Sequence, residues 1–251
     1  MLPVLRVVIP MPGFGRIHSL SDTAYGHPGN SQFPSILPLL IFICQNRPKG
    51  LFLTYMSKAA KTRQFIIETA APIFNQKGVA GTAISDIMEA TRLAKGGLYG
   101  NFSSKEEMVL DVFDYIAEQE KNRLRALTAQ ASTATGKFEA IFSYYARFPL
   151  NREIAGGCPM LNFGVEADDT NPDLKEKVNE LIGYFQHRIR LLVQFGKDNG
   201  EFKKDWDEER FAILMFTMLE GAIFVTNITN NNRQMLIVLD FLRKEIKHHS
   251  K

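Results

Sequence analysis

The residues best suited to chemistry lie in one short stretch that combines positive charge, glycine and polar side chains. Lys95 and Lys105 carry charge that can neutralise phosphates and release their counterions. Tyr99 can donate its hydroxyl to a phosphate, and the amide of Asn101 can reach a phosphate or a base edge. Gly96–Gly97 costs about 1 kcal/mol per residue in a helix, which makes sense where the backbone approaches a ligand closely. These residue types point to contacts with nucleic acid.

The distribution of charge supports the same interpretation. The 251-residue chain has a net charge of +3. Residues 1–55 hold four basic residues and one acidic residue, and residues 56–105 hold seven basic and three acidic residues. Residues 106–251 hold 19 basic and 23 acidic residues. A compact basic segment joined to a longer acidic one indicates a polyanion-binding unit on a body of another kind.

Other chemistries find little support in the sequence. Cys44 and Cys158 are far apart and cannot build a disulfide framework, which favours a reducing cytoplasm. The five histidines lack metal-ligand spacing, so we expect no metal. We also expect no cofactor and no catalytic residues, because no nucleophile triad, carboxylate pair or phosphate loop is evident. No unbroken apolar run of about 18 residues occurs, so we expect no membrane partner.

Residues 1–55 differ in composition from the remainder. They hold seven of the eleven prolines, and no helical or strand period survives there. The apolar run 36–44 is broken by Pro38 and is too short to cross a bilayer. We expect these residues to be a non-native, disordered extension, with Met56 as the physiological start.

From Met56 onward, apolar residues recur with helical spacing and no alternating strand pattern appears, so we expect an all-α fold. Gly78 should end the first helix, Pro72 should kink it, and Thr82 should cap the second. Ser103 or Ser104 should cap the fourth helix. The predicted helices span residues 58–77, 83–90, 94–101, 105–131, 138–148, 173–197, 208–228 and 233–248.

Two short helices joined by a tight turn within residues 83–102 form a helix-turn-helix candidate. This part of the chain resembles the TetR family of bacterial transcriptional regulators. The residues that carry the resemblance are Phe74, Lys77, Gly78, Gly81, Thr82, Asp86, Ile87, Ala90, Lys95, Gly96, Gly97, Leu98, Tyr99, Phe102, Ser104, Lys105, Glu106 and Glu107. The resemblance implies a three-helix DNA-binding domain over residues 56–118.

The resemblance also implies which residues contact double-stranded operator DNA. The sequence departs from the family at Gly100, where an aromatic or polar residue is common, and at Asn101, where a histidine is common. Carried over position by position, the contacts fall on Thr82, Ala94, Lys95, Gly96, Gly97, Tyr99, Asn101 and Lys105.

For residues 119–251 the resemblance implies a helical domain with a ligand pocket and a dimer interface formed by the last two helices. Two broad apolar faces support this independently, one over residues 211–223 and one over residues 235–246. Symmetric packing of two such helix pairs would make a four-helix bundle in a homodimer. Burial of both faces within one monomer is the alternative.

Aromatic and methionine side chains in the middle helices suit a small apolar or aromatic ligand. The segment 156–160 resembles one branch of the family, some of whose members sense electrophiles or oxidants through a cysteine. If Pro159 opens a helix, the helix dipole lowers the pKa of the Cys158 thiol; the alternative is a small buried thiol. The candidate ligand-binding residues are Cys158, Met160, Asn162, Phe163, Glu166, Tyr184 and His187.

Together these features predict a cytoplasmic, nucleoid-associated regulator. We expect a ligand-released repressor that binds a pseudo-palindromic operator as a homodimer. A DNA-binding regulator that needs no ligand, or a helical enzyme, is the alternative. Because two separate sites on one chain are implied, ligand and DNA should affect each other's binding by the same factor.

Overall fold

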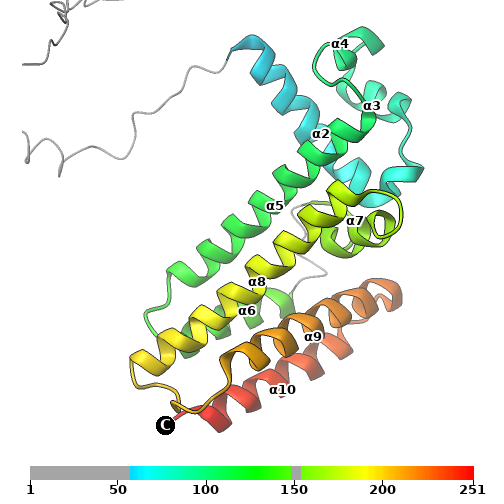
Figure 1. Cartoon of the computed structure of the whole chain (residues 1–251). Helices are drawn as coiled ribbons and strands as arrows, with labels where there is room; N and C mark the ends of the chain where they lie inside the picture. The colour runs from blue at the N-terminus through cyan, green and yellow to red at the C-terminus, as the bar shows by residue number, and fades with distance from the viewer. Residues whose placement is uncertain (1–56, 148–153) are drawn as a thin grey trace, which may run out of the picture. The chain divides into compact units, whose positions relative to one another are not determined.

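The computed structural model describes residues 57–147 and 154–251. Within those two ranges the regular structure is helical, apart from one isolated bridge between Phe202 and Ser250. The predicted all-α fold is therefore confirmed (Figure 1). The expectation that residues 1–55 form a disordered extension lies outside the described residues.

The first part of the described chain is built from four helices around one apolar core. These are α2 (Lys58–Gly81), α3 (Ile84–Thr91), α4 (Lys95–Tyr99) and the long α5 (Lys105–Ala129). Helical spacing of the apolar residues turns one face of each helix inward. The largest buried side chains of this core include Phe74, Ile87, Leu98, Phe102 and Phe113.

The junction between α2 and α3 agrees with the prediction at Gly78 and differs from it at Thr82. Gly78 is the non-helical residue within α2, with φ 76° and ψ 168°, so the first regular stretch ends there as predicted and a further helical stretch runs on to Gly81. The kink or local strain at Pro72 stays a prediction. Thr82 does not cap α3: its side chain is buried, and its hydroxyl donates to the Gly78 carbonyl at 2.6 Å. Ala83 takes the cap position instead, and its N–H donates to Asp86.

The other helix boundaries agree more closely with those predicted from the sequence. Ala94 precedes the first turn of α4, and Ser104 caps α5 by accepting from the Glu107 N–H at 3.1 Å, as predicted. Helix α5 continues without a break beyond residue 118, so a single helix connects the two halves of the described chain. The next helix, α6 (Ala134–Ala146), starts earlier than expected because Thr133 caps it, and it ends at Ala146 rather than at residue 148.

The second part contains α7 (Pro159–Ala167), α8 (Pro172–Asp198), α9 (Glu208–Thr229) and α10 (Arg233–His249). Helices α5 and α8 run side by side, and α9 and α10 form an antiparallel pair that packs against α8 and α6 (Figure 1). Asn171 and Asp207 cap α8 and α9 through their side chains. The apolar core here includes Phe138, Phe142, Trp206, Phe211, Met215 and Leu242.

Within the described residues, α9 is the one helix long and apolar enough to cross a membrane by length and composition. A core helix of a water-soluble protein passes the same test, and Phe211, Met215 and Leu219 of α9 are buried in the core.

Candidate functional site

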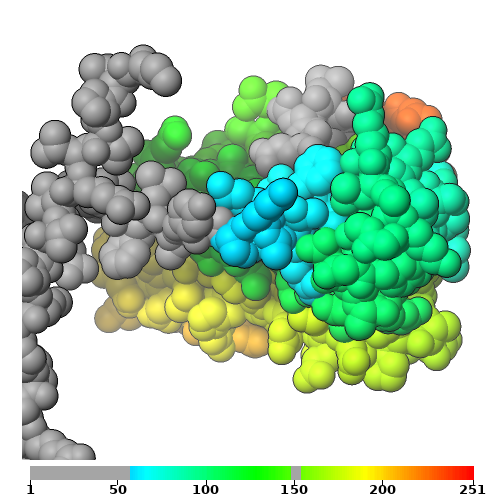
Figure 2. Space-filling model, turned by 90° about the horizontal axis from the view of Figure 1, so that it is seen from above, coloured from blue at the N-terminus to red at the C-terminus, as the bar shows by residue number. Residues whose placement is uncertain are grey.

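Helix α4 exposes a short surface that carries charge and an aromatic side chain. Leu98 is 1% exposed and fixes the helix to the core, which turns Lys95, Gly96 and Tyr99 outward. The Lys95 Nζ lies 5.8 Å from the centre of the Tyr99 ring. Figure 2 shows the segment from α3 to the start of α5 as an open surface beside α2. A single α-helix such as α4 fits into a DNA major groove.

The two glycines of α4 meet little of the protein itself. A Cβ added at Gly96 would have no neighbour within 4 Å, and one at Gly97 would meet Leu93 at 3.5 Å, an ordinary contact. Internal packing therefore requires neither glycine. This supports the idea that the Gly96 backbone is kept bare for an external ligand, whereas Gly97 is half-buried.

Arg63 of α2 fixes the end of α4, a role that no sequence pattern had indicated. Its guanidinium pairs with Glu107 at 2.6 Å and Asp111 at 2.7 Å, and Nη1 donates to the carbonyl of Asn101. The same group stacks 4.1 Å from the centre of the Phe102 ring. Hydrogen bonds from Ser103, followed by the one from Arg63, lower the pKa of Glu107 to about 2. Arg63 thus joins α2, α5 and the turn after α4.

The other predicted DNA-contact residues divide into exposed and occupied groups. Ala94 is exposed, and Lys105 is half-exposed at the first residue of α5. The Asn101 amide is engaged, because its Nδ2 donates to the Gly97 carbonyl at 2.8 Å. Thr82 is buried, so the expected contact between its hydroxyl and a phosphate does not fit this conformation.

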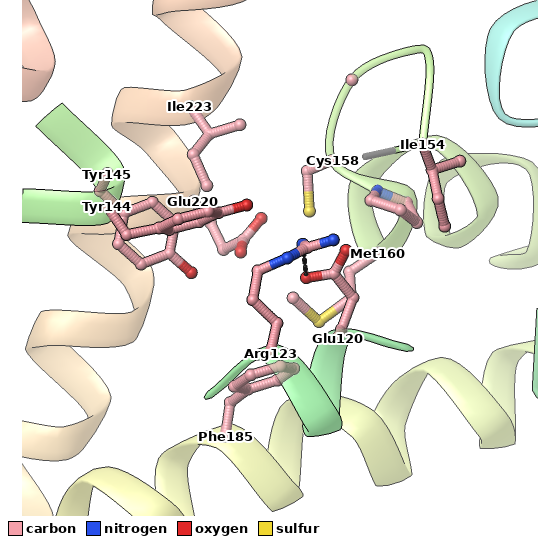
Figure 3. Close-up of a pocket in the computed structure, with 12 residues that line it drawn as sticks. Glu120, Arg123, Tyr144, Tyr145, Ile154, Cys158, Met160, Phe185, Glu220 and Ile223 are labelled. Atoms are coloured by element: carbon pink, nitrogen blue, oxygen red, sulfur yellow. Dashed lines mark hydrogen bonds and ion pairs between the residues drawn. The ribbon is translucent and has the colours of Figure 1, made fainter. Parts of the chain in front are cut away.

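A second candidate site is a cavity of about 30 Å³ lined from α5, α6, the start of α7, α8 and α9 (Figure 3). Glu120 and Arg123 of α5 form an ion pair at 2.6 Å beside it. The other lining residues include Tyr144, Tyr145, Ile154, Cys158, Met160, Phe185, Glu220 and Ile223. Such a volume holds a water molecule or two, so a larger ligand requires side chains to move.

Glu220 is the unusual side chain of this cavity. Its Oε2 is buried without a hydrogen-bond partner among the described residues. Burial raises the pKa of Glu220 to about 7 against the opposing effect of a hydrogen bond with the Cys158 side chain, and the nearby charge of Glu120 adds to the rise. The sequence offered a signal that was overlooked, because Glu220 is the single charged residue in the apolar stretch 211–229.

Cys158 lies where the sequence placed it, and the structure decides between the two interpretations of its thiol. It precedes Pro159, the first residue of α7, at the helix N-terminus. The side chain is 5% exposed, and burial followed by the charge of Glu220 raises the pKa of the thiol well above its usual value. The alternative, a small buried thiol, therefore holds, because desolvation outweighs the helix dipole.

The structure brings Cys158 and Met160 to the cavity and places the remaining predicted ligand residues elsewhere. Phe163 packs in the other core, with its ring centre 5.4 Å from that of Phe113. Tyr184 lies beside Lys121 of α5, and His187 is exposed next to Arg190. None of these three lines the cavity.

Asn162 and Glu166 contact α2 rather than the cavity. The Asn162 Nδ2 donates to the carbonyl of Asn75 at 2.8 Å. The Glu166 carboxylate accepts from the backbone N–H groups of Val79 at 2.8 Å and Ala80 at 2.7 Å. One end of α7 thus lines the cavity while its polar face binds α2, the first helix of the DNA-binding part.

A third feature is a row of exposed apolar side chains on α9 and α10. Their exposed fractions run from 44% at Ile213 to 68% at Ile228. Isolated exposed apolar residues are common, but seven of them on two paired helices indicate an interaction surface. The row consists of Ile213, Leu214, Phe224, Ile228, Leu236, Ile237 and Phe241.

The fold and the exposed α4 define a helix-turn-helix DNA-binding protein, and comparisons with known proteins identify its family. Residues 66–112 match the family model "Bacterial regulatory proteins, tetR family", and residues 134–241 match "Tetracyclin repressor-like, C-terminal domain". A TetR-family regulator from Cytophaga hutchinsonii is 35% identical with a TM-score of 0.72, and one from Chloroflexus aurantiacus is 37% identical with a TM-score of 0.73. Each alignment covers 78% of this chain and 98% of the other. This chain belongs to the TetR family.

More distant relatives are named as regulators too. The transcriptional repressor DhaR of a Mycobacterium species is 21% identical over 69% of this chain and 86% of its own length. The regulator TtgR of Pseudomonas putida is 24% identical over 66% of this chain and 80% of its own length. The chain is a DNA-binding transcriptional regulator, and its relatives are regulators rather than enzymes.

Proposed function

We propose that this regulator binds a pseudo-palindromic operator as a homodimer and represses transcription until a small ligand releases it. The observation that carries the proposal is the outward face of α4, where Lys95, Gly96 and Tyr99 are exposed while Leu98 holds the helix in place. Residues 56–118 would form the DNA-binding domain and residues 119–251 the ligand-binding and dimerisation domain. Such a protein acts in the bacterial cytoplasm, at the nucleoid.

The apolar row on α9 and α10 supports dimerisation through these helices. Pairing this row with its copy across a two-fold axis would bury the exposed side chains in a four-helix bundle. Most residues of the two apolar faces expected from the sequence, such as Met215 and Leu239, are buried in the monomer core, as the alternative of burial within one monomer has it. The dimer proposal therefore rests on the exposed row, whose members such as Phe224 and Phe241 lie outside that core. Two chains would present two copies of α4 to successive major grooves.

Helix α7 supports coupling between the cavity and the DNA-binding part. Its first residues and its N-cap line the cavity, whereas Asn162 and Glu166 hydrogen-bond to α2 near Gly78. A ligand that shifts α7 would therefore shift α2 and the recognition helix attached to it. A regulator without a ligand is the alternative, and it predicts no effect of any cavity ligand on operator affinity.

A reporter gene placed behind a bound DNA site tests repression directly. Expression should be low with the wild-type chain and should rise with Lys95→Ala, which removes a phosphate-neutralising charge. Lys204→Ala, an exposed lysine before α9, is the matched control and should still repress. Lower expression with Lys95→Ala than with the wild type would indicate an activator instead.

A further inference from the structure

The cavity beside Glu220 adjoins a much larger hollow on the outside of the molecule. A groove of about 690 Å³ runs between α5 and α6, lined by residues that include Asn122, Ala126, Leu127 and Ala140. Arg123 and Tyr144 line both the groove and the cavity. These two side chains therefore form the wall between the two spaces.

That wall consists of side chains and not of backbone. The Arg123 guanidinium lies 5.5 Å from the centre of the Tyr144 ring and pairs with Glu120 at 2.6 Å (Figure 3). Rotation of Arg123 and Tyr144 would join the inner cavity to the groove without moving a helix. The joined space falls in the range of about 300–1,000 Å³ that is typical of small-molecule sites.

The inner end of the joined space has an excess of negative groups. Glu120 and Glu220 face it with one guanidinium, Arg123, and that guanidinium is paired with Glu120. The Glu220 Oε2 is buried without a hydrogen-bond partner in the described part of the chain. Aromatic rings of Tyr144, Tyr145 and Phe185 surround the same space, and ring faces attract cations.

We propose that the effector of this regulator is a small organic cation with an apolar or aromatic body. Its charged nitrogen lies against Glu220 in the inner cavity, and its body lies in the groove between α5 and α6 after Arg123 and Tyr144 turn aside. The role as effector rests on the proposed function, whereas cation binding at this place does not. An anionic ligand would be repelled by the two carboxylates.

The proposal implies a characteristic dependence on pH. The groups that face Glu220 are Glu120 and Arg123 from α5, Tyr144 and Tyr145 from α6, and Cys158 at the start of α7; α8 contributes the uncharged Phe185. Because the pKa of Glu220 is about 7, a permanent cation must displace a proton to pair with it at lower pH. Affinity should rise by up to about tenfold per pH unit below 7 and level off above it.

Calorimetric titration of the full chain without DNA tests the proposal. The probes are phenyltrimethylammonium, its uncharged carbon isostere tert-butylbenzene, and the anion benzoate. We expect the affinity to fall from the cation to the isostere to the anion, and we expect only the affinity for the cation to depend on pH. Equal binding of the cation and its isostere, or preference for benzoate, would overturn the proposal.

Variants locate the site. Glu220→Gln keeps the shape of the side chain but removes its charge. It should therefore lower the affinity for the cation by roughly tenfold or more and leave the affinity for the uncharged isostere nearly unchanged. The matched control Glu209→Gln removes an exposed acid from the same helix and should leave cation affinity unchanged. Equal affinity of Glu220→Gln and wild type for the cation would refute the site. Failure of the unliganded wild-type protein to bind an operator would instead count against the proposed function.

Discussion

Glu166 of α7 lies directly against Gly78 of α2, at the one interruption in that helix. The carboxylate fills the space that a Cβ on Gly78 would need and accepts from the next two backbone N–H groups. A helix interruption leaves N–H groups unpaired, and a carboxylate is a strong partner for them. The break in α2 and the acid on α7 therefore form one structural unit that fixes the DNA-binding helices to the cavity wall.

Gly78→Ala tests that unit. The residue has φ 76° and ψ 168°, which a side chain tolerates poorly, and a Cβ would clash with Glu166. We expect the free energy of unfolding to fall by about 2 kcal/mol and operator affinity to fall with it. Gly183→Ala, in the middle of α8 with open space around it, is the control and should stabilise by about 0.5–1 kcal/mol. Chemical denaturation measures the free energy of unfolding of both variants. An equal change in the two variants would show that Gly78 has no special role.

The sequence predicted this unit only in part. Helical spacing and Ser104 located most of the helices, because local periodicity and side-chain caps are encoded by near neighbours, but the predicted ranges leave out α7. Glu166 was assigned to a ligand because nothing near it in the sequence shows that Gly78, 88 positions earlier, lies beside it. Arg63 was missed for the same reason, since its role comes from partners brought close by the tertiary fold. Glu220 did carry a local signal, its isolation in an apolar stretch, but its neighbours in the cavity are set by the tertiary fold.

The dimer interface can be tested by placing charge in the exposed apolar row. Phe241→Arg puts a cation where the proposed two-fold packing buries an aromatic ring, so we expect the dimer to dissociate into folded monomers. Leu191→Arg changes a comparably exposed residue on α8, outside the row, and should leave the dimer intact. Sedimentation velocity gives the mass of each. A fully dimeric Phe241→Arg protein would place the interface elsewhere.

Glu220 should make the protein less stable as the pH rises. Its pKa in the folded state is about 7, against an ordinary value of 4.5. The neutral form is therefore favoured by folding, and its contribution is full below about pH 4.5 and is lost as the pH rises through 7. The loss is on the order of 3 kcal/mol, from the size of the shift.

Glu220→Gln should remove this dependence. We expect the melting temperature of the variant, relative to the wild type, to increase between pH 5 and pH 8. Glu209→Gln serves as the control and should follow the wild type throughout. A constant difference between Glu220→Gln and wild type across this range would show that the carboxyl ionises normally.

Cys158 should react slowly in the folded protein. Its thiol is buried and its pKa is raised, and thiolates are the reactive species. In a Cys44→Ser background, so that one thiol remains, modification by a thiol reagent at pH 7.5 should require unfolding in denaturant. Operator binding should also survive mild peroxide. Rapid modification of the native protein would restore Cys158 as a candidate sensor.

The central claim is that two copies of α4 in one dimer read DNA, and selection of bound sequences from a random DNA library tests it most directly. The account predicts enrichment of an inverted repeat whose half-sites lie about 34–36 Å apart, or a multiple of one helical turn, with two chains per site. Lys95→Ala should weaken DNA binding and reduce the slope of log affinity against log salt concentration by about one unit. No enriched sequence, or a single half-site bound by one chain with an affinity independent of Lys95, would contradict the account.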